Sequence, residues 1–305
     1  MIKKSIFVFL FLFAGYSIYI SSRPTLSSSQ HFWQANMIKA QKFIYDESDT
    51  FSHVIVGSSL AALLVKDSLP SFYNLSFGGT GPFNGLSIIK RKDKAPKNVF
   101  IEMNTVLIEE RKEFTNSIYS FVPYIMRKYF LSLRADKQPI PLYIDHSDAV
   151  RRKIASLCIR CKIESVLNRK IFDSNPAMRT NESANSKEAF DLMLANQIES
   201  YSMKPDSLLM KQQMTLVLEY VSYLRSRGSR VWFFEMPINS ELVNLPQSKL
   251  LRDEIHRNFP SSVVTYIDQD TTSYTTTDGL HLNLAEAIRY THHFNSKVKK
   301  NGNSN

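Results

Sequence analysis

Cysteine is scarce in this chain, which has only two among its 305 residues, Cys158 and Cys161. They form a Cys-x-x-Cys pair, but no second pair and no nearby histidine completes a zinc-binding set. The pair also falls in a stripe of apolar residues with helical spacing. A local disulfide in an oxidising compartment and two buried thiols that pack a helix both stay open as interpretations. Neither predicts catalysis, and we expect no metal and no other cofactor.

Long low-complexity tracts and internal repeats are also missing from the sequence. Hydrophobic residues make up 43% of the chain and charged residues 22%, which is ordinary for a globular protein. The length suffices for a large core, in one big domain or two small ones. No nucleic-acid-binding motif accompanies the net charge of +10, so nucleic acid is not an expected partner.

The N-terminus carries a short basic segment with Lys3 and Lys4, followed by an apolar run from Ile6 to Ile20. The run is shorter than the roughly 20 residues of a full membrane span. We therefore predict that residues 1–22 are either a cleaved signal peptide or an uncleaved N-terminal membrane anchor. In both cases the positive-inside rule places the rest of the chain outside the cytoplasm.

A strongly basic segment lies between Arg151 and Lys170, where Glu164 is the single acid. One interpretation is the solvated face of a helix. The other is a patch for anionic lipid headgroups or an acidic glycan.

Five short apolar runs are spaced along the chain, and each ends at a turn-forming residue. They are almost continuously apolar, as expected of strands that are covered on both faces. Helix-like patterns separate them, and a further helix is expected directly after Gly57. We predict strands at 53–57, 72–75, 98–103, 230–236 and 263–267, and helices at 33–45, 82–90, 208–227, 250–259 and 283–290.

Strands that alternate with helices predict an α/β fold with a doubly wound parallel sheet. The segment from about 105 to 206 breaks the alternation and is predicted to be a mostly helical insertion after the third strand. At that position it could serve as a lid or a substrate platform. Residues 23–50 are predicted as a connector, 51–298 as the main domain and 299–305 as a polar tail.

Ser59 stands in a Gly-Ser-Ser-Leu segment directly after the first predicted strand. Gly57 permits a sharp turn, and the N-terminus of a following helix favours a developing anion. The Ser59 hydroxyl is thus a candidate nucleophile. The alternative is a serine that only caps the helix.

Asp278-Gly279-Leu280-His281 is the most specific segment of the sequence. A spacing of three residues lets Asp278 accept from one imidazole nitrogen of His281 while the other nitrogen faces a nucleophile. The sequence offers no such partner or context for the other histidines, which are His31, His53, His146, His256, His292 and His293. Of these, His292 and His293 are predicted to lie at a solvated helix end.

Gly79 and Asn104 follow the second and third predicted strands. The backbone N–H groups of Ser59 and Gly79 and the side-chain amide of Asn104 are candidate donors to an oxyanion. An ordinary turn at Gly79 and a cap or turn at Asn104 are the alternatives, and Gly78 could replace Gly79. Because ligands bind at the carboxyl ends of parallel strands, we expect these residues to converge.

With these blocks in this order, the chain resembles the SGNH/GDSL hydrolase superfamily over about residues 50–295. Ser59, Gly79, Asn104 and the Asp278–His281 pair match its four blocks. The resemblance implies a flavodoxin-like three-layer α/β/α fold and a catalytic triad of Ser59, His281 and Asp278. Two departures are that Ser58 replaces the usual acid of the first block, and that a middle block reads Glu-Met-Asn.

Both departures look like the exported, membrane-tethered branch that modifies cell-surface polymers, similar to alginate O-acetylation and teichoic-acid D-alanylation proteins. This implies an esterase or O-acyltransferase, with acetyl as the expected acyl group, acting on an envelope or extracellular polysaccharide. A membrane acyl-donor protein is a further expected partner, and the implied location is the bacterial periplasm or the outer side of the membrane. A non-catalytic glycan-binding or assembly partner and a membrane-proximal lipid esterase are the alternatives.

Overall fold

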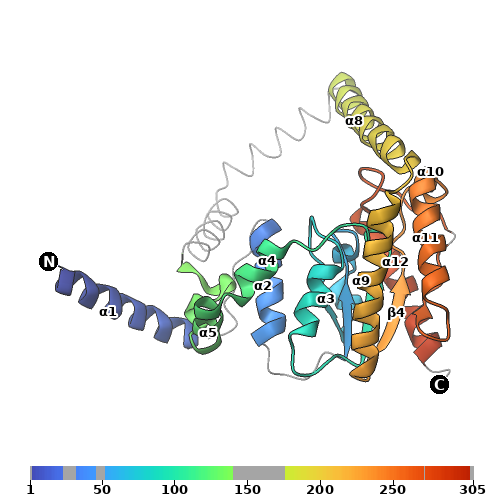
Figure 1. Cartoon of the computed structure of the whole chain (residues 1–305). Helices are drawn as coiled ribbons and strands as arrows, with labels where there is room; N and C mark the ends of the chain where they lie inside the picture. The colour runs from blue at the N-terminus through green and yellow to red at the C-terminus, as the bar shows by residue number, and fades with distance from the viewer. Residues whose placement is uncertain (1, 23–31, 46–51, 140–175, 271, 303–305) are drawn as a thin grey trace. The chain divides into compact units, whose positions relative to one another are not determined.

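The structure is a computed structural model that describes residues 2–22, 32–45, 52–139, 176–270 and 272–302. Figure 1 labels most of its α-helices and strand β4. The chain divides into two compact units. The first consists of Met1–Tyr45 and Asn116–Ser186, and the second of Asp46–Thr115 and Lys187–Asn305. Cys158, Cys161 and the basic segment 151–170 lie outside the described residues.

The second unit is built on a five-stranded sheet in the order β2-β1-β3-β4-β5, with every neighbouring pair parallel. This confirms the predicted α/β fold and the flavodoxin-like strand order. The order reverses between β1 and β3, so the loops after these two strands flank the point where ligands bind in such sheets. The strands are β1 (His53–Val56), β2 (Phe72–Asn74), β3 (Asn98–Glu102), β4 (Arg230–Phe234) and β5 (Thr265–Tyr266).

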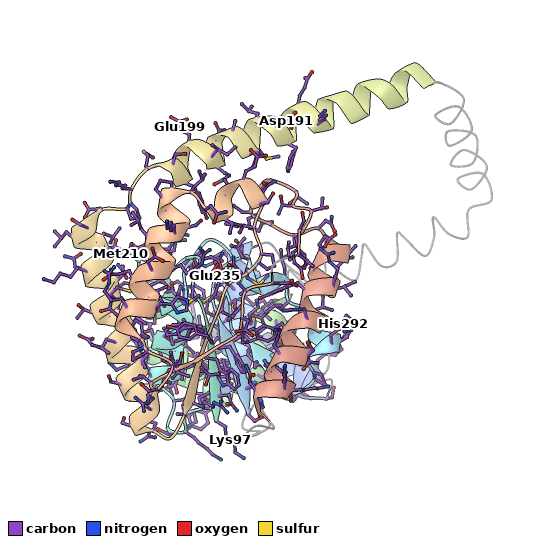
Figure 2. The ribbon with its side chains drawn as sticks, turned by 90° about the vertical axis from the view of Figure 1, so that its right-hand side faces the viewer. Lys97, Asp191, Glu199, Met210, Glu235 and His292 are labelled. Carbon is purple, nitrogen blue, oxygen red and sulfur yellow. The ribbon has the colours of Figure 1, made fainter. Side chains whose placement is uncertain are left out.

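Helices cover both faces of the sheet because the strands are apolar on both sides. On one face, Phe294 of α12 (Leu284–Gly302) packs against Phe100 and Phe234, with ring centroids 5.6 and 5.1 Å apart. The other face carries α3 (Phe83–Lys90), α9 (Ser207–Ser226) and α11 (Pro246–Asn258). Figure 2 shows α9, labelled at Met210, and α12, labelled at His292, on either side of the strands.

The segment between β3 and β4 is helical, as predicted, and contributes to both units. It includes α4 (Lys112–Tyr119), α5 (Phe121–Tyr129), the short 3₁₀ helices η3 (Leu131–Leu133) and η4 (Ala135–Lys137), and α8 (Pro176–Ser202). The part of α8 from residue 187 onward belongs to the second unit. Leu194 and Tyr201 of this part are buried in the core of that unit.

The first unit contains α1 (Ile2–Ser21), α2 (Phe32–Tyr45), α5, η3 and η4. Gln41 of α2 accepts a hydrogen bond from Ala135 N at 2.8 Å, and the rings of Tyr45 and Tyr124 lie 5.8 Å apart. In the described part of the chain, α1 is the one helix long and apolar enough to cross a membrane, a property that signal sequences share.

Some sequence-based boundaries were wrong. No α-helix follows Gly57. The chain there forms the 3₁₀ helices η1 (Ala61–Leu63) and η2 (Lys66–Ser68). Leu63 N and Leu64 N donate three residues back, to Leu60 O and Ala61 O, and Leu64 then leaves the helical conformation with a ψ of 126°. A full helix dipole therefore does not follow the candidate nucleophile.

The last helix was also predicted too short. It extends to Gly302, so that His292 and His293 lie inside α12 and not at its end. His293 has a carboxylate partner after all, since its Nδ1 lies 3.3 Å from Asp270 Oδ2. That partner was invisible in the sequence because the loop with Asp270 reaches His293 only through the tertiary fold.

Phe294 should anchor α12 to the sheet. We expect Phe294→Ala to lower the free energy of unfolding by about 3–5 kcal/mol, because it empties a site between Phe100 and Phe234. Leu284→Ala on the same helix is the control and should change it by less than about 0.5 kcal/mol, since Leu284 is 75% exposed. Urea denaturation measures both. Equal losses would contradict this account of the core.

Candidate active site

Hydrogen bonds to the buried carboxylate of Glu102, the last residue of β3, fix the turn after β1. Ser58 donates to this carboxylate twice, from its N–H at 2.7 Å and from its hydroxyl at 3.0 Å. Ala61 N and Thr105 Oγ1 donate to it at 3.3 and 3.1 Å. The side chain of Ser58 thus points into the protein, and the next residue, Ser59, is left half-buried at the surface.

Gly57 is required by this arrangement. A Cβ on Gly57 would lie 2.4 Å from Glu102 Oε2 and 2.9 Å from Ala61 Cβ, closer than atoms can approach. The glycine therefore lets the carboxyl group reach the turn, in addition to letting the chain bend.

Ser59 lies in hydrogen-bond contact with His281, although the two residues are far apart in the sequence. The distance from His281 Nε2 to Ser59 Oγ is 2.8 Å, and that from His281 Nδ1 to Asp278 Oδ2 is 2.7 Å. With its proton on Nδ1, the imidazole donates to the carboxylate and accepts from the serine hydroxyl. This is the geometry in which a histidine can take the proton of an attacking serine.

Asp278 is held as an anion by its own loop. Burial acts to raise the pKa of this carboxyl, but hydrogen bonds from the His281 backbone and ring and from Leu280 N outweigh it and lower the pKa below its usual value. The three-residue spacing explains this, because Asp278 Oδ1 accepts the N–H groups of Leu280 and His281 at 3.0 and 2.7 Å. The carboxylate can therefore stabilise an imidazolium.

Gly79 reaches the same edge through the loop after β2, which is tied to the first turn by Phe77 N donating to Gly57 O at 3.1 Å. Gly79 has a φ of +73° and is exposed. Its N–H and that of Ser59 have the chemistry of an oxyanion donor.

Asn104 follows β3 and braces the neighbouring strand end. Its Nδ2 donates to Met236 O at 3.0 Å, and its Oδ1 accepts from Met236 N at 2.7 Å. An amide nitrogen carries two hydrogens, and this pairing uses one of them. The second hydrogen is the one that an oxyanion could accept.

Arg111 brings a positive charge close to Gly79, in the loop after β2. Both terminal nitrogens of its exposed guanidinium lie 3.9 Å from the position that a Cβ on Gly79 would occupy. The backbone that carries it is fixed, because Arg111 N donates to Asn84 Oδ1 at 3.1 Å. An anionic group bound beside Gly79 would meet this charge.

The end of α8 lies over the Asp278–His281 loop. A Cβ on Gly279 would lie 3.1 Å from Leu194 Cδ1 and 3.6 Å from Gln197 Cγ. Tyr201, further along α8, is buried, and burial together with the nearby Glu102 raises the pKa of its hydroxyl to about 12. In Figure 2, Glu199 of α8 lies towards the end of the sheet at which Glu235 follows β4. The helical insertion thus contributes to the surroundings of the site.

A cavity of about 300 Å³ lies beside the loop of Asp278, where Asn239 N donates to Gly279 O at 2.9 Å. Its walls combine hydroxyl, amide and carboxylate groups with the apolar side chains of Pro237, Ile238 and Val243. The polar and aromatic lining residues are Ser240, Asn244, Gln269, Asp270, Thr272, Ser273 and Tyr274. Within the described ranges, no group of three or more His, Cys, Asp or Glu side chains is placed to hold a metal ion.

The sequence pointed to Ser59, Asp278 and His281, which the structure brings into contact, but not to Glu102 or Arg111. An acid inside a strand predicted to be covered on both faces was a usable signal for Glu102, because a buried carboxyl needs hydrogen-bond partners. It also links two segments of the sequence, because Glu102 of the Glu-Met-Asn segment accepts from the hydroxyl of Ser58. No comparable signal marks Arg111.

The chain matches no protein-family model and no curated protein.

Glu102 offers a test of how the turn is held. Burial raises its pKa, although the hydrogen bonds from Ser58, Thr105 and Ala61 oppose the shift. Its stabilising contribution is therefore full at a pH below the unfolded pKa and is lost as the pH rises through the raised folded pKa. In Glu102→Gln, the amide oxygen can face the two backbone N–H groups and the NH₂ can face the two hydroxyls. We expect this variant to fold, and its free energy of unfolding relative to wild type to increase with pH across that window.

Glu102→Ala is the matched variant, and it should lower the free energy of unfolding by at least about 2 kcal/mol because it leaves buried donors unpaired. Denaturation curves at several pH values measure both variants. A difference between Glu102→Gln and wild type that does not change with pH would contradict the raised pKa.

Proposed function

We propose that this protein is an exported serine esterase or O-acyltransferase of the SGNH/GDSL type, acting on acyl esters of a cell-envelope or extracellular polysaccharide. The observation that carries the proposal is the hydrogen-bonded chain from Ser59 through His281 to Asp278. The site's position after β1, at the point where the strand order reverses, supports it.

In the proposed reaction, Ser59 Oγ attacks the acyl carbon and His281 Nε2 takes its proton. Asp278 stabilises the imidazolium, and the N–H groups of Ser59 and Gly79 with the amide of Asn104 stabilise the oxyanion. His281 then protonates the departing alcohol, which leaves an acyl-Ser59 enzyme. Water or a sugar hydroxyl, deprotonated by His281, accepts the acyl group and restores the free serine.

Two features support a carbohydrate substrate. The cavity beside the Asp278 loop carries several hydroxyl and amide groups, a lining that suits hydrogen bonds with a sugar. The charge of Arg111 beside Gly79 suits a polymer that carries anionic groups.

The triad can be tested by covalent labelling with a fluorophosphonate probe and by turnover of an aryl acetate. Ser59→Ala should abolish labelling and lower kcat on the order of 10⁶-fold. Asp278→Asn should lower it on the order of 10⁴-fold, because the imidazole would no longer be held in the required tautomer.

Ser58→Ala is the control for this test. It removes a hydroxyl that bonds to Glu102 and should reduce stability, but it should keep labelling by the probe. Labelling that survives Ser59→Ala and disappears in Ser58→Ala would refute the proposed mechanism.

Arg111 can be tested by comparing an acylated anionic polysaccharide with a neutral aryl ester. Arg111→Gln should reduce kcat/KM on the anionic substrate about 2- to 5-fold, the effect of one exposed charge, and leave the neutral ester unchanged. Arg225→Gln, at the end of α9 near the amino ends of the strands, is the control and should change neither. Equal losses on both substrates in Arg111→Gln would exclude charge recognition by this residue.

A further inference from the structure

Helix α1 packs on the rest of the first unit along one stripe of its surface. The residues of this stripe, Phe13, Tyr16, Ser17 and Ile20, recur at the helical spacing of three and four and are the partly or fully buried residues of the helix. Ile20 is completely buried, and Ser17 Oγ lies 2.9 Å from Ser132 Oγ. The Tyr16 hydroxyl donates to Lys137 O, and the ring of Phe13 lies 5.7 Å from that of Phe130.

A signal peptide that is removed has no reason to fit the finished protein. In this chain, the last two turns of α1 pack against the segment 130–137 and form hydrogen bonds with it. The rest of α1 is exposed and almost wholly apolar. These two properties together are those of an anchor that spans a bilayer and holds a folded unit at its end.

Helix α5 is amphipathic in the opposite sense to a helix of a soluble protein. Its inner face carries the charged Arg127, which donates to Ser117 O at 3.3 Å, and Tyr124, whose ring packs against that of Tyr45. Its other face carries what we call the outer stripe, whose members are apolar or aromatic and exposed. The outer stripe consists of Phe121, Val122, Ile125, Met126 and Tyr129, of which Phe121 and Tyr129 are 75% and 72% exposed.

The outer stripe is continuous with the proposed anchor. Phe130, directly after α5, contacts Phe13, which lies about 12 Å along the helix from Ser21 at 1.5 Å per residue. If α1 spans a bilayer, this contact brings α5 to the depth of the headgroups and outer acyl chains, where amphipathic helices bury their apolar faces. Exposed Lys128 beside the outer stripe suits anionic headgroups.

We propose that α1 is retained in the finished protein and that the outer stripe of α5 is set into the lipid bilayer beside it. This goes beyond the proposed function, because it holds for any reaction at Ser59. A bilayer accounts at once for the exposed apolar surface of α1 and for the inverted polarity of α5.

The experiment uses the full chain with Ser59→Ala, in vesicles of phosphatidylcholine and phosphatidylglycerol, so that its outcome is independent of activity. Trp33→Phe removes the exposed native tryptophan, whereas Trp232 is buried and constant. Phe121→Trp and, separately, Tyr129→Trp then report on the outer stripe, and both conserve an aromatic ring. Leu218→Trp on α9, at a position that is 50% exposed, is the control. Brominated lipid and aqueous iodide serve as quenchers.

We expect brominated lipid to quench the two stripe tryptophans several-fold more than the Leu218→Trp control, and iodide to show the reverse order. Iodide quenching at the stripe equal to that of the control would overturn the proposal. Shielding from both quenchers would also overturn it, since a protein partner or second copy would then cover the outer stripe. The intact mass of the membrane-extracted protein should include α1, and loss of that helix would refute its retention.

Discussion

A single buried carboxyl group, that of Glu102, determines how the candidate site is built. It accepts hydrogen bonds from N–H groups and hydroxyls in and near the turn after β1. The side chain of Ser58 therefore points inward, and that of Ser59 is left at the surface. Burying an acid costs free energy unless donors surround it, and here the turn itself supplies them. The strand pair β1–β3 and the turn are thus mutually dependent, because Gly57 must lack a side chain for the carboxyl group to fit.

The other half of the site comes from a loop nearly at the end of the second unit. Asp278 organises that loop by accepting two backbone N–H groups, and the same carboxylate orients His281. The insertion covers this loop through Leu194 of α8. One local hydrogen-bond set positions Ser59 and another positions Asp278 with His281, and the two sets meet across the sheet edge. Gly279 is the one residue of the histidine loop with a positive φ.

Much of this arrangement could be read from the sequence, because it depends on local signals. Apolar runs ending at glycine or asparagine marked β1, β2 and β3, and the alternation of strands and helices predicted the parallel sheet. The Asp278–His281 spacing is likewise local. What could not be read depends on tertiary contacts: the pairing of Glu102 with Ser58, the approach of Arg111 to Gly79, and Asp270 beside His293. The expected helix after Gly57 failed for the same reason, since the turn ends at Leu64 and Val65 N then donates to Thr291 Oγ1 of α12.

The stripe on α1 has a consequence for the order of events during synthesis. Ser17 and its partner Ser132 are separated by 115 positions in the chain. At about 5–20 residues per second, the helix waits on the order of ten seconds before its partner segment emerges. If α1 anchors the protein as proposed, Phe13, Tyr16, Ser17 and Ile20 face only lipid or the export machinery during that interval. The sequence of such an anchor has to satisfy two environments in turn, first as an isolated apolar helix and then as one wall of a protein unit.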